Sequence, residues 1–183
     1  MTTQLYLPAL GKAITDRLQG DTTLLGLLAG ADATAQKLRI TNTFPLMAAD
    51  PPGTTYPHVT HYCAGAEVDD PLDGRRHVVG IEVRWKVQEQ KEGATPANQL
   101  RVFHKILERL IGDFPAQLLS AGPSYGLDRW KPSFAGYTGE YASAYSPEEM
   151  VLKSWADITD MSSGGIREGM ANFEVGIDQT RSG

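Results

Sequence analysis

Three side chains that can bind a metal or act as nucleophiles lie within six residues: His58, His61 and Cys63. The segment is typical of a strand, in which alternate residues face opposite sides. His61 and Cys63 then share one face and His58 points to the other, so the three cannot hold one zinc ion without a bulge. No helix N-terminus or positive cluster adjoins Cys63 to lower the pKa of its thiol. We therefore expect two strand histidines and a small buried thiol, with no metal site.

Known catalytic motifs give no firmer indication of an enzyme. The sequence contains no P-loop, no G-x-G-x-x-G fingerprint and no H-E-x-x-H helix, and we expect no G-x-S-x-G nucleophile elbow. His104 and Glu108 stand four residues apart on a predicted helix, and an exposed polar pair explains that spacing as well as an acid–base role. We predict that the protein is not an enzyme and has no catalytic residues, no cofactor and no metal.

Composition indicates a folded domain with its own core. A chain of 183 residues buries enough surface to fold without disulfides, and its single cysteine excludes an internal one. The 17 basic and 22 acidic residues give a formal charge of -5, whereas a sequence-independent nucleic-acid binder needs a basic stripe. The first residues lack the pattern of a signal peptide, and no apolar stretch is long enough to span a membrane. We expect a soluble, intracellular protein.

Hydrophobic periodicity predicts the elements that must position any site. Pro8 opens a helix over residues 10–18, and Asp21 caps a second, shorter helix closed by Gly30. The best-defined helix spans 96–111, with Thr95 as its N-cap, Pro96 in its first turn and Gly112 at its end. Strict alternation over 78–87 predicts a strand with one buried face. Further strands are expected at 37–43, 58–63, 150–158 and 171–177, the last two joined by a turn at 162–165.

These elements predict an α+β fold: an antiparallel or mixed β-sheet with two to three helices packed mainly on one face, and long loops. We expect a core domain over residues 1–120. An extension over 121–183 would then add an aromatic-rich loop and two C-terminal strands that complete or augment the sheet. The segments 41–57, 64–76 and 121–148 are long for loops, and such loops are usually functional or ordered by a partner.

Two of these long segments carry candidate contact residues. Segment 64–76 contains several acidic residues and then two arginines, and it is either a solvated hairpin tip or an arm that faces a neighbouring subunit or a charged channel. Segment 121–148 contains six aromatic residues, Tyr125, Trp130, Phe134, Tyr137, Tyr141 and Tyr145. Tyrosine is favoured at interfaces where one end of the side chain stays wet. Interface and second-layer core both remain open for this segment.

The order of the elements carries a resemblance. A helix and a leucine-rich turn over residues 10–30 are followed by Arg39-Ile40 in a short strand. After a proline-rich loop, Tyr56-Pro57-His58-Val59 enters a strand, and a polar arm, the alternating strand and the helix at 96–111 come next. This layout resembles the tail terminator (tail completion) proteins of long-tailed bacteriophages. The resemblance covers roughly residues 10–119, and the chain has more sequence after Ser120 than the shorter family members.

The resemblance implies a virion structural protein of the phage neck, assembled in the host cytoplasm. Such a protein forms a homo-oligomeric ring, usually a hexamer, that caps the tail tube and joins it to the head connector. The implied partners are other copies of the chain, the tail tube protein and the head-tail connector or stopper protein. DNA would pass through the lumen without specific binding, which an acidic lining favours, and no membrane is involved.

For contacts with subunits or partners we predict two groups of residues. The arm contributes Asp69, Asp70, Arg75 and Arg76, and the aromatic segment contributes Tyr125, Trp130, Tyr137 and Tyr141. The nearest alternative is another neck component, the head-tail connector or stopper. A further alternative is a small-molecule-binding α+β module that uses the aromatic segment as a pocket. The last is a metal-dependent cytosolic protein that uses His58, His61 or Cys63.

Overall fold

The computed structural model describes residues 6–43, 56–68, 76–88, 96–112, 124–135, 145–160 and 165–179. Within these residues the chain has the expected α+β fold, with helices on a six-stranded sheet that is mixed because β1 and β2 are parallel. In chain order the elements are α1 (Leu7–Gln19), α2 (Thr22–Leu25), α3 (Ala33–Lys37), β1 (Ile40–Asn42), β2 (His58–Val68), β3 (Arg76–Gln88), α4 (Pro96–Ile111), β4 (Tyr145–Pro147), β5 (Val151–Asp157) and β6 (Ile166–Gln179).

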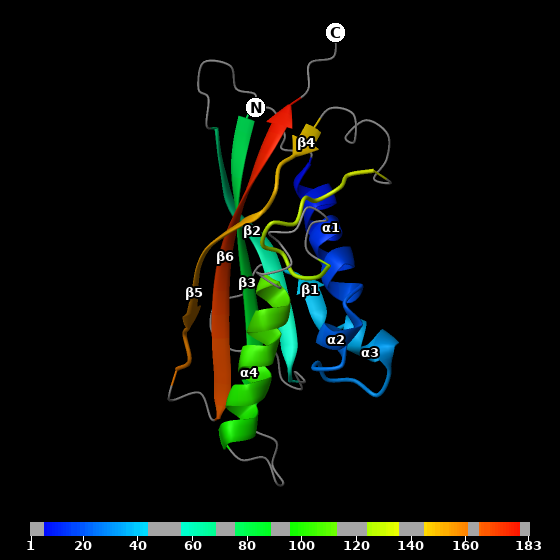
Figure 1. Cartoon of the computed structure of the whole chain (residues 1–183), viewed down its shortest axis with the longest axis vertical. Helices are drawn as coiled ribbons and strands as arrows, with labels where there is room; N and C mark the ends of the chain where they lie inside the picture. Colours follow the sequence, from blue (N-terminus) through cyan, green and yellow to red (C-terminus); the bar gives the residue numbers. More distant parts are fainter. Residues whose placement is uncertain are drawn as a thin grey trace.

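The sheet is organised around β3 and β6. These two strands pair antiparallel along their whole length, from Arg76 opposite Asp178 to Gln88 opposite Ile166. On the other side of β3 lies β2, which is antiparallel to it, and then β1. On the other side of β6 lie β4, near the end of that strand, and β5, along residues 169–174 (Figure 1). The C-terminal strand is therefore an interior strand of the sheet.

Alternating burial explains why these strands form. In β3 the side chains of Val79, Ile81, Val83, Trp85 and Val87 are buried, and the residues between them are half-buried on the opposite face. The expected strands at 78–87, 58–63 and 171–177 are confirmed, and each is longer than predicted. Because β2 continues to Val68 and β3 begins at Arg76, the expected long arm at 64–76 is mostly strand in the part that the structure describes.

The long helices α1 and α4 cover the face of the sheet that carries the buried β3 residues. The buried stripe of α4 includes Phe103, whose ring lies 5.1 Å from that of Trp85. The buried stripe of α1 includes Leu10 and Ile14, which belong to the same core cluster. Figure 1 shows both helices beside the strands that they cover. Burial of one such side chain stabilises the fold by about 1.5–3 kcal/mol. No helix among the described residues has the length and apolar character to cross a membrane.

Residues 21–43 differ from the prediction. The helix that begins after Asp21 ends at Leu25 and does not continue to Gly30. The expected strand at 37–43 is only Ile40–Asn42, because the short helix α3 precedes it and includes Lys37. The cause is local: the carboxylate of Asp32 accepts a hydrogen bond from the Ala35 amide and so caps α3, which the sequence analysis did not anticipate.

Several predicted features lie outside the described residues. They are the N-cap at Thr95, most of the turn at 162–165, and five of the predicted contact residues, Asp69, Asp70, Arg75, Tyr137 and Tyr141.

Candidate functional site

The polar cluster with the most extensive contacts joins α2 to α4 through Asp21 and Arg109. Arg109 donates from Nε to Oδ2 of Asp21 at 2.8 Å and from Nη2 to Oδ1 at 2.7 Å. The same carboxylate accepts hydrogen bonds from the amides of Thr23 and Leu24, which confirms Asp21 as the N-cap of α2. The Asp21 side chain is only 6% exposed and that of Arg109 is 19% exposed, so this two-point ion pair is largely desolvated.

The segment that begins at Ser124 is fixed to the helices by two arginines. The guanidinium carbon of Arg109 lies 3.3 Å from the ring centroid of Tyr125, which places the cation on the ring face. Arg17 of α1 donates to the carbonyl oxygen of Gly126 at 3.1 Å, and its guanidinium lies 5.5 Å from the Trp130 ring. Burial lowers the pKa of Arg17 below its ordinary value, and the carboxylate of Asp21 opposes that shift.

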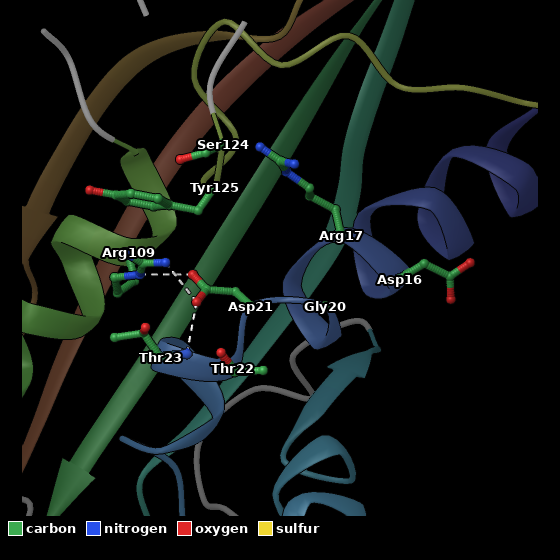
Figure 2. A pocket seen from close by; sticks show the side chains of 9 residues that line it. All are labelled: Asp16, Arg17, Gly20, Asp21, Thr22, Thr23, Arg109, Ser124 and Tyr125. Atoms are coloured by element: carbon green, nitrogen blue, oxygen red, sulfur yellow. Dashed lines mark hydrogen bonds and ion pairs between the residues drawn. The ribbon is translucent and has the colours of Figure 1, made fainter. Parts of the chain in front are cut away.

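A cavity of about 430 Å³ opens between these groups. Figure 2 shows its nine lining residues, Asp16, Arg17, Gly20, Asp21, Thr22, Thr23, Arg109, Ser124 and Tyr125. They come from the end of α1, the start of α2, the last turns of α4 and the segment after residue 123. The two charged groups in closest contact in the cavity, Asp21 and Arg109, bind each other. The walls thus consist of hydroxyls, one aromatic face and charges that are paired within the chain.

Ser124 requires a correction to the motif analysis. Residues 122–126 read Gly-Pro-Ser-Tyr-Gly and do match the G-x-S-x-G pattern, against expectation. A nucleophile elbow places its serine on a tight turn that leads from a strand into a helix. Here residues 124–127 form bends, and the described chain continues through a turn at 128–129 into a stretch without regular secondary structure at 130–134. In the part of the chain that the structure describes, no histidine lines the cavity beside Ser124 as a general base would.

The predicted contact residues within the described part fall in two separate places. Tyr125 and Trp130 are both half-buried against the arginines of α4 and α1. Arg76 instead begins β3, where its Nη2 lies 2.8 Å from Oε2 of Glu148 and its Nε lies 3.9 Å from Oδ1 of Asp178. Each of these three residues thus has a partner within its own chain.

A third cluster, which the sequence analysis missed, holds the start of α1 to the sheet. The hydroxyl of Tyr6 lies 2.7 Å from Nδ1 of His77 on β3, and the Tyr145 ring lies 5.0 Å from the Tyr6 ring. Tyr6 is fully buried, and burial together with the nearby Tyr145 and Cys63 raises its pKa to about 12. No sequence signal relates residues 6, 77 and 145, because only the folded chain brings them together.

The possible metal ligands of β2 point as the strand alternation predicts. His61 is fully buried, with Nε2 2.8 Å from Oγ1 of Thr15 on α1. His58 pairs in register with Lys86 on the opposite face, where it cannot reach the side of His61. Burial raises the pKa of the Cys63 thiol to about 11, so it is protonated at neutral pH. Among the described residues, no group of three His, Cys, Asp or Glu side chains is placed to hold a metal ion.

The sheet face opposite α1 and α4 carries a ladder of charges. Arg84 contacts Glu82 along β3 and Glu168 across on β6, where its Nη1 lies 3.4 Å from Oε1. Lys86 lies 3.7 Å from the other oxygen of Glu168. Burial and the neighbouring Glu82 raise the pKa of Tyr62 to about 12. Positive and negative groups alternate here, so this face has no single sign of charge.

Comparisons with known proteins found one similar solved structure to report and no matching family. No known protein family matches the chain, and no curated protein matches it. Among solved structures, it is similar to a chain described as "Virion of native gene transfer agent (GTA) particle", at 10% identity and a TM-score of 0.48. The match covers 97% of this chain and 99% of that chain.

Proposed function

We propose that this protein is a structural component of a phage-like virion, a tail terminator that forms a ring at the neck. One observation carries the proposal: the elements on which the resemblance rests occur in the structure in the same order. They are the helix and leucine-rich turn, the short strand, the two long antiparallel strands and the covering helix, from α1 to α4. They belong to a single core cluster, so the resemblance extends to elements that pack together.

The site geometry is in keeping with a structural role. Arg17 and Arg109 hold the segment after residue 123 against the helices, and Asp21 and Arg109 neutralise each other. These contacts stiffen a surface and offer no acid–base pair for catalysis. In this proposal the ring joins the tail tube protein to the head-tail connector or stopper, and DNA crosses its lumen unbound. The arm around Arg76 and the aromatic segment around Tyr125 and Trp130 reach the adjacent subunits.

The first test is the mass of the purified protein in solution. Light scattering measures the oligomer, and negative-stain imaging with and without phage tail tubes shows whether the protein caps tube ends. Rings, or density at tube ends, are the expected result. A protein that stays monomeric and does not bind tail tubes would contradict the proposal. A ring that binds isolated connectors but not tubes would instead favour the alternative of a connector or stopper.

The cavity at Tyr125 favours one second candidate, a small-molecule-binding module. Its volume of about 430 Å³ lies in the range of ligand sites. Its lining of paired charges and hydroxyls is less apolar than such sites usually are. A binding module is expected to be a stable monomer or dimer whose melting temperature rises with a small ligand. Screening a library of small polar compounds by thermal shift on the wild type and on Tyr125→Ala tests this candidate.

A further inference from the structure

The sheet leaves two stretches of strand without a partner on one side. Among the described residues, β1 pairs with β2 only from Val59 to His61, so the end of β2, Cys63–Val68, is an open edge. β5 pairs only with β6 and forms the opposite margin of the sheet, as Figure 1 shows. Each open stretch presents backbone N–H and C=O groups that can extend the sheet.

Each open edge carries one exposed apolar side chain on the same face. Val68 is 48% exposed at the end of β2, and Trp155 is 49% exposed on β5. Val68 stands opposite His77, and Trp155 stands opposite the buried Ala171. Both positions lie on the face that α1 and α4 cover, since residues in register share a face of the sheet. If β2 of one copy pairs with β5 of another, Val68 and Trp155 can cover each other.

The directions of β2 and β5, and one charged side chain on each, also suit a contact between two copies. Three antiparallel steps separate β2 from β5, so the two edges run in opposite directions. If copies of the chain are related by rotation about an axis parallel to the strands, each strand keeps its direction. β5 of one copy then lies antiparallel to β2 of the next copy. Glu67 is exposed beside Val68, and Lys153 is 51% exposed on β5 in a surface pair with Glu174. Lys153 can thus turn to Glu67 of the next copy, since an exposed pair such as Lys153–Glu174 exchanges partners at little cost.

The extent of overlap and the position of the bulges favour one register. Each edge has one irregularity, between Cys63 and Gly65 in β2 and between Leu152 and Ser154 in β5. If Trp155 stands opposite Ala66 of the next copy, the regular stretches 65–67 and 154–156 face each other between the two bulges. Trp155 then shares a face with Ala66 and Val68, and Ser154 stands opposite Glu67. Placing Trp155 opposite Val68 would also avoid both bulges, but it overlaps the two strands over fewer residues.

We infer that β5 of one copy adds to residues 63–68 of β2 in the next copy, as an antiparallel extension of the sheet in which Trp155 covers Ala66 and Val68. Because the two edges differ, the contact is head-to-tail, and repeated around an axis it closes a ring. This inference rests on the proposed function in taking the partner to be a second copy of the chain.

Disulfide cross-linking tests the register. The double variant Glu67→Cys/Ser154→Cys, made in a Cys63→Ala background, places two thiols opposite each other only across the inferred contact. Within one chain β2 and β5 are three strand spacings apart, about 14 Å, beyond the reach of a disulfide. Under mild oxidation we expect a ladder of covalent oligomers that disappears with reductant. The matched control Tyr62→Cys/Ser154→Cys uses the same strands and the same face, beyond the stretch that β1 pairs, but in the wrong register, and should give no ladder.

A second variant tests the edge without new cysteines. Trp155→Asp should weaken self-association by at least about tenfold, because it places a charge in the apolar contact. Its unfolding curve should match the wild type, since Trp155 is half exposed within one chain. If rings form but the cysteine pair gives no ladder and Trp155→Asp assembles normally, the edge pairing is wrong and the ring stands. If the protein is monomeric even with tail tubes, both the ring and the edge pairing are wrong.

Discussion

At the scale of single residues, His61 has the most constrained environment. It is fully buried between β2 and α1, with Nε2 next to the Thr15 hydroxyl, which in turn donates to the carbonyl oxygen of Gly11. Its other ring nitrogen, Nδ1, is buried and has no hydrogen-bond partner among the described residues. Burial lowers the pKa of His61 from 6.5 to about 4. The histidine is therefore neutral in the folded protein at any physiological pH.

This environment predicts a loss of stability in acid. As the pH falls below 6.5, the unfolded chain binds a proton at His61 that the folded chain does not bind until about pH 4. The free energy of unfolding should therefore fall across that window, by about 3 kcal/mol in total from this group. Urea unfolding at about pH 7 and about pH 4, on wild type and His61→Gln, measures the effect. An equal loss in both proteins would show that His61 does not cause it.

Gly169 gives a second prediction at this scale. A Cβ added there would collide with Cζ2 of Trp85, whose indole lies against the β6 backbone. Gly169→Ala should destabilise the protein by about 1–3 kcal/mol, because the buried ring must move. Gly80→Ala on β3 is the control, since its Cβ would meet only the Gly65 carbonyl oxygen at 3.8 Å. Chemical denaturation of both variants measures their stability. Similar midpoints would contradict the close contact between Gly169 and the Trp85 indole.

At the scale of elements, Asp21 acts on two helices at once. It caps α2 through two backbone amides and pairs with Arg109 near the end of α4. Asp21→Ala removes the cap and leaves Arg109 without its carboxylate, so we expect a loss of about 3 kcal/mol in the free energy of unfolding. Denaturant unfolding of the purified variant measures it.

The matched control for Asp21 is the other helix cap. Asp32 caps α3 through the Ala35 amide at an exposed site. Asp32→Ala should cost only about 1 kcal/mol. Asp21→Asn keeps a capping oxygen but removes the charge, and should fall between the two. If Asp21→Ala and Asp32→Ala cost the same, the ion pair with Arg109 adds nothing to stability.

At the scale of the whole molecule, Trp130 links the fold to the proposed assembly. It is half-buried against the core beside Arg17 and keeps part of its surface outside. Trp130→Ala should leave the chain folded, by circular dichroism, while it weakens ring formation at least about tenfold in light scattering. Leu38→Ala is the control: it also truncates an apolar side chain, which is 71% exposed, and should assemble as the wild type does. A Trp130→Ala protein with wild-type association would remove this residue from the predicted contacts.

The sequence by itself determined much of the local structure. The alternation over 78–87, the helix at 96–111 and the cap at Asp21 follow from side-chain spacing and from hydrogen bonds between near neighbours, and the structure confirms all three. The cap at Asp32 had a signal of the same kind, an aspartate before a helical run, and was missed. Strand ends were less well predicted, because edges and neighbours decide where a strand stops.

Only the tertiary structure decided how distant residues meet. The place of β6 beside β3, the stacking of Arg109 on Tyr125 and the bond between Tyr6 and His77 join parts of the chain that local patterns do not relate. The same holds for the two open edges at β2 and β5, which exist because of the strand order. Strand order is set by the total free energy of burying residues far apart in sequence, and no local pattern encodes that sum.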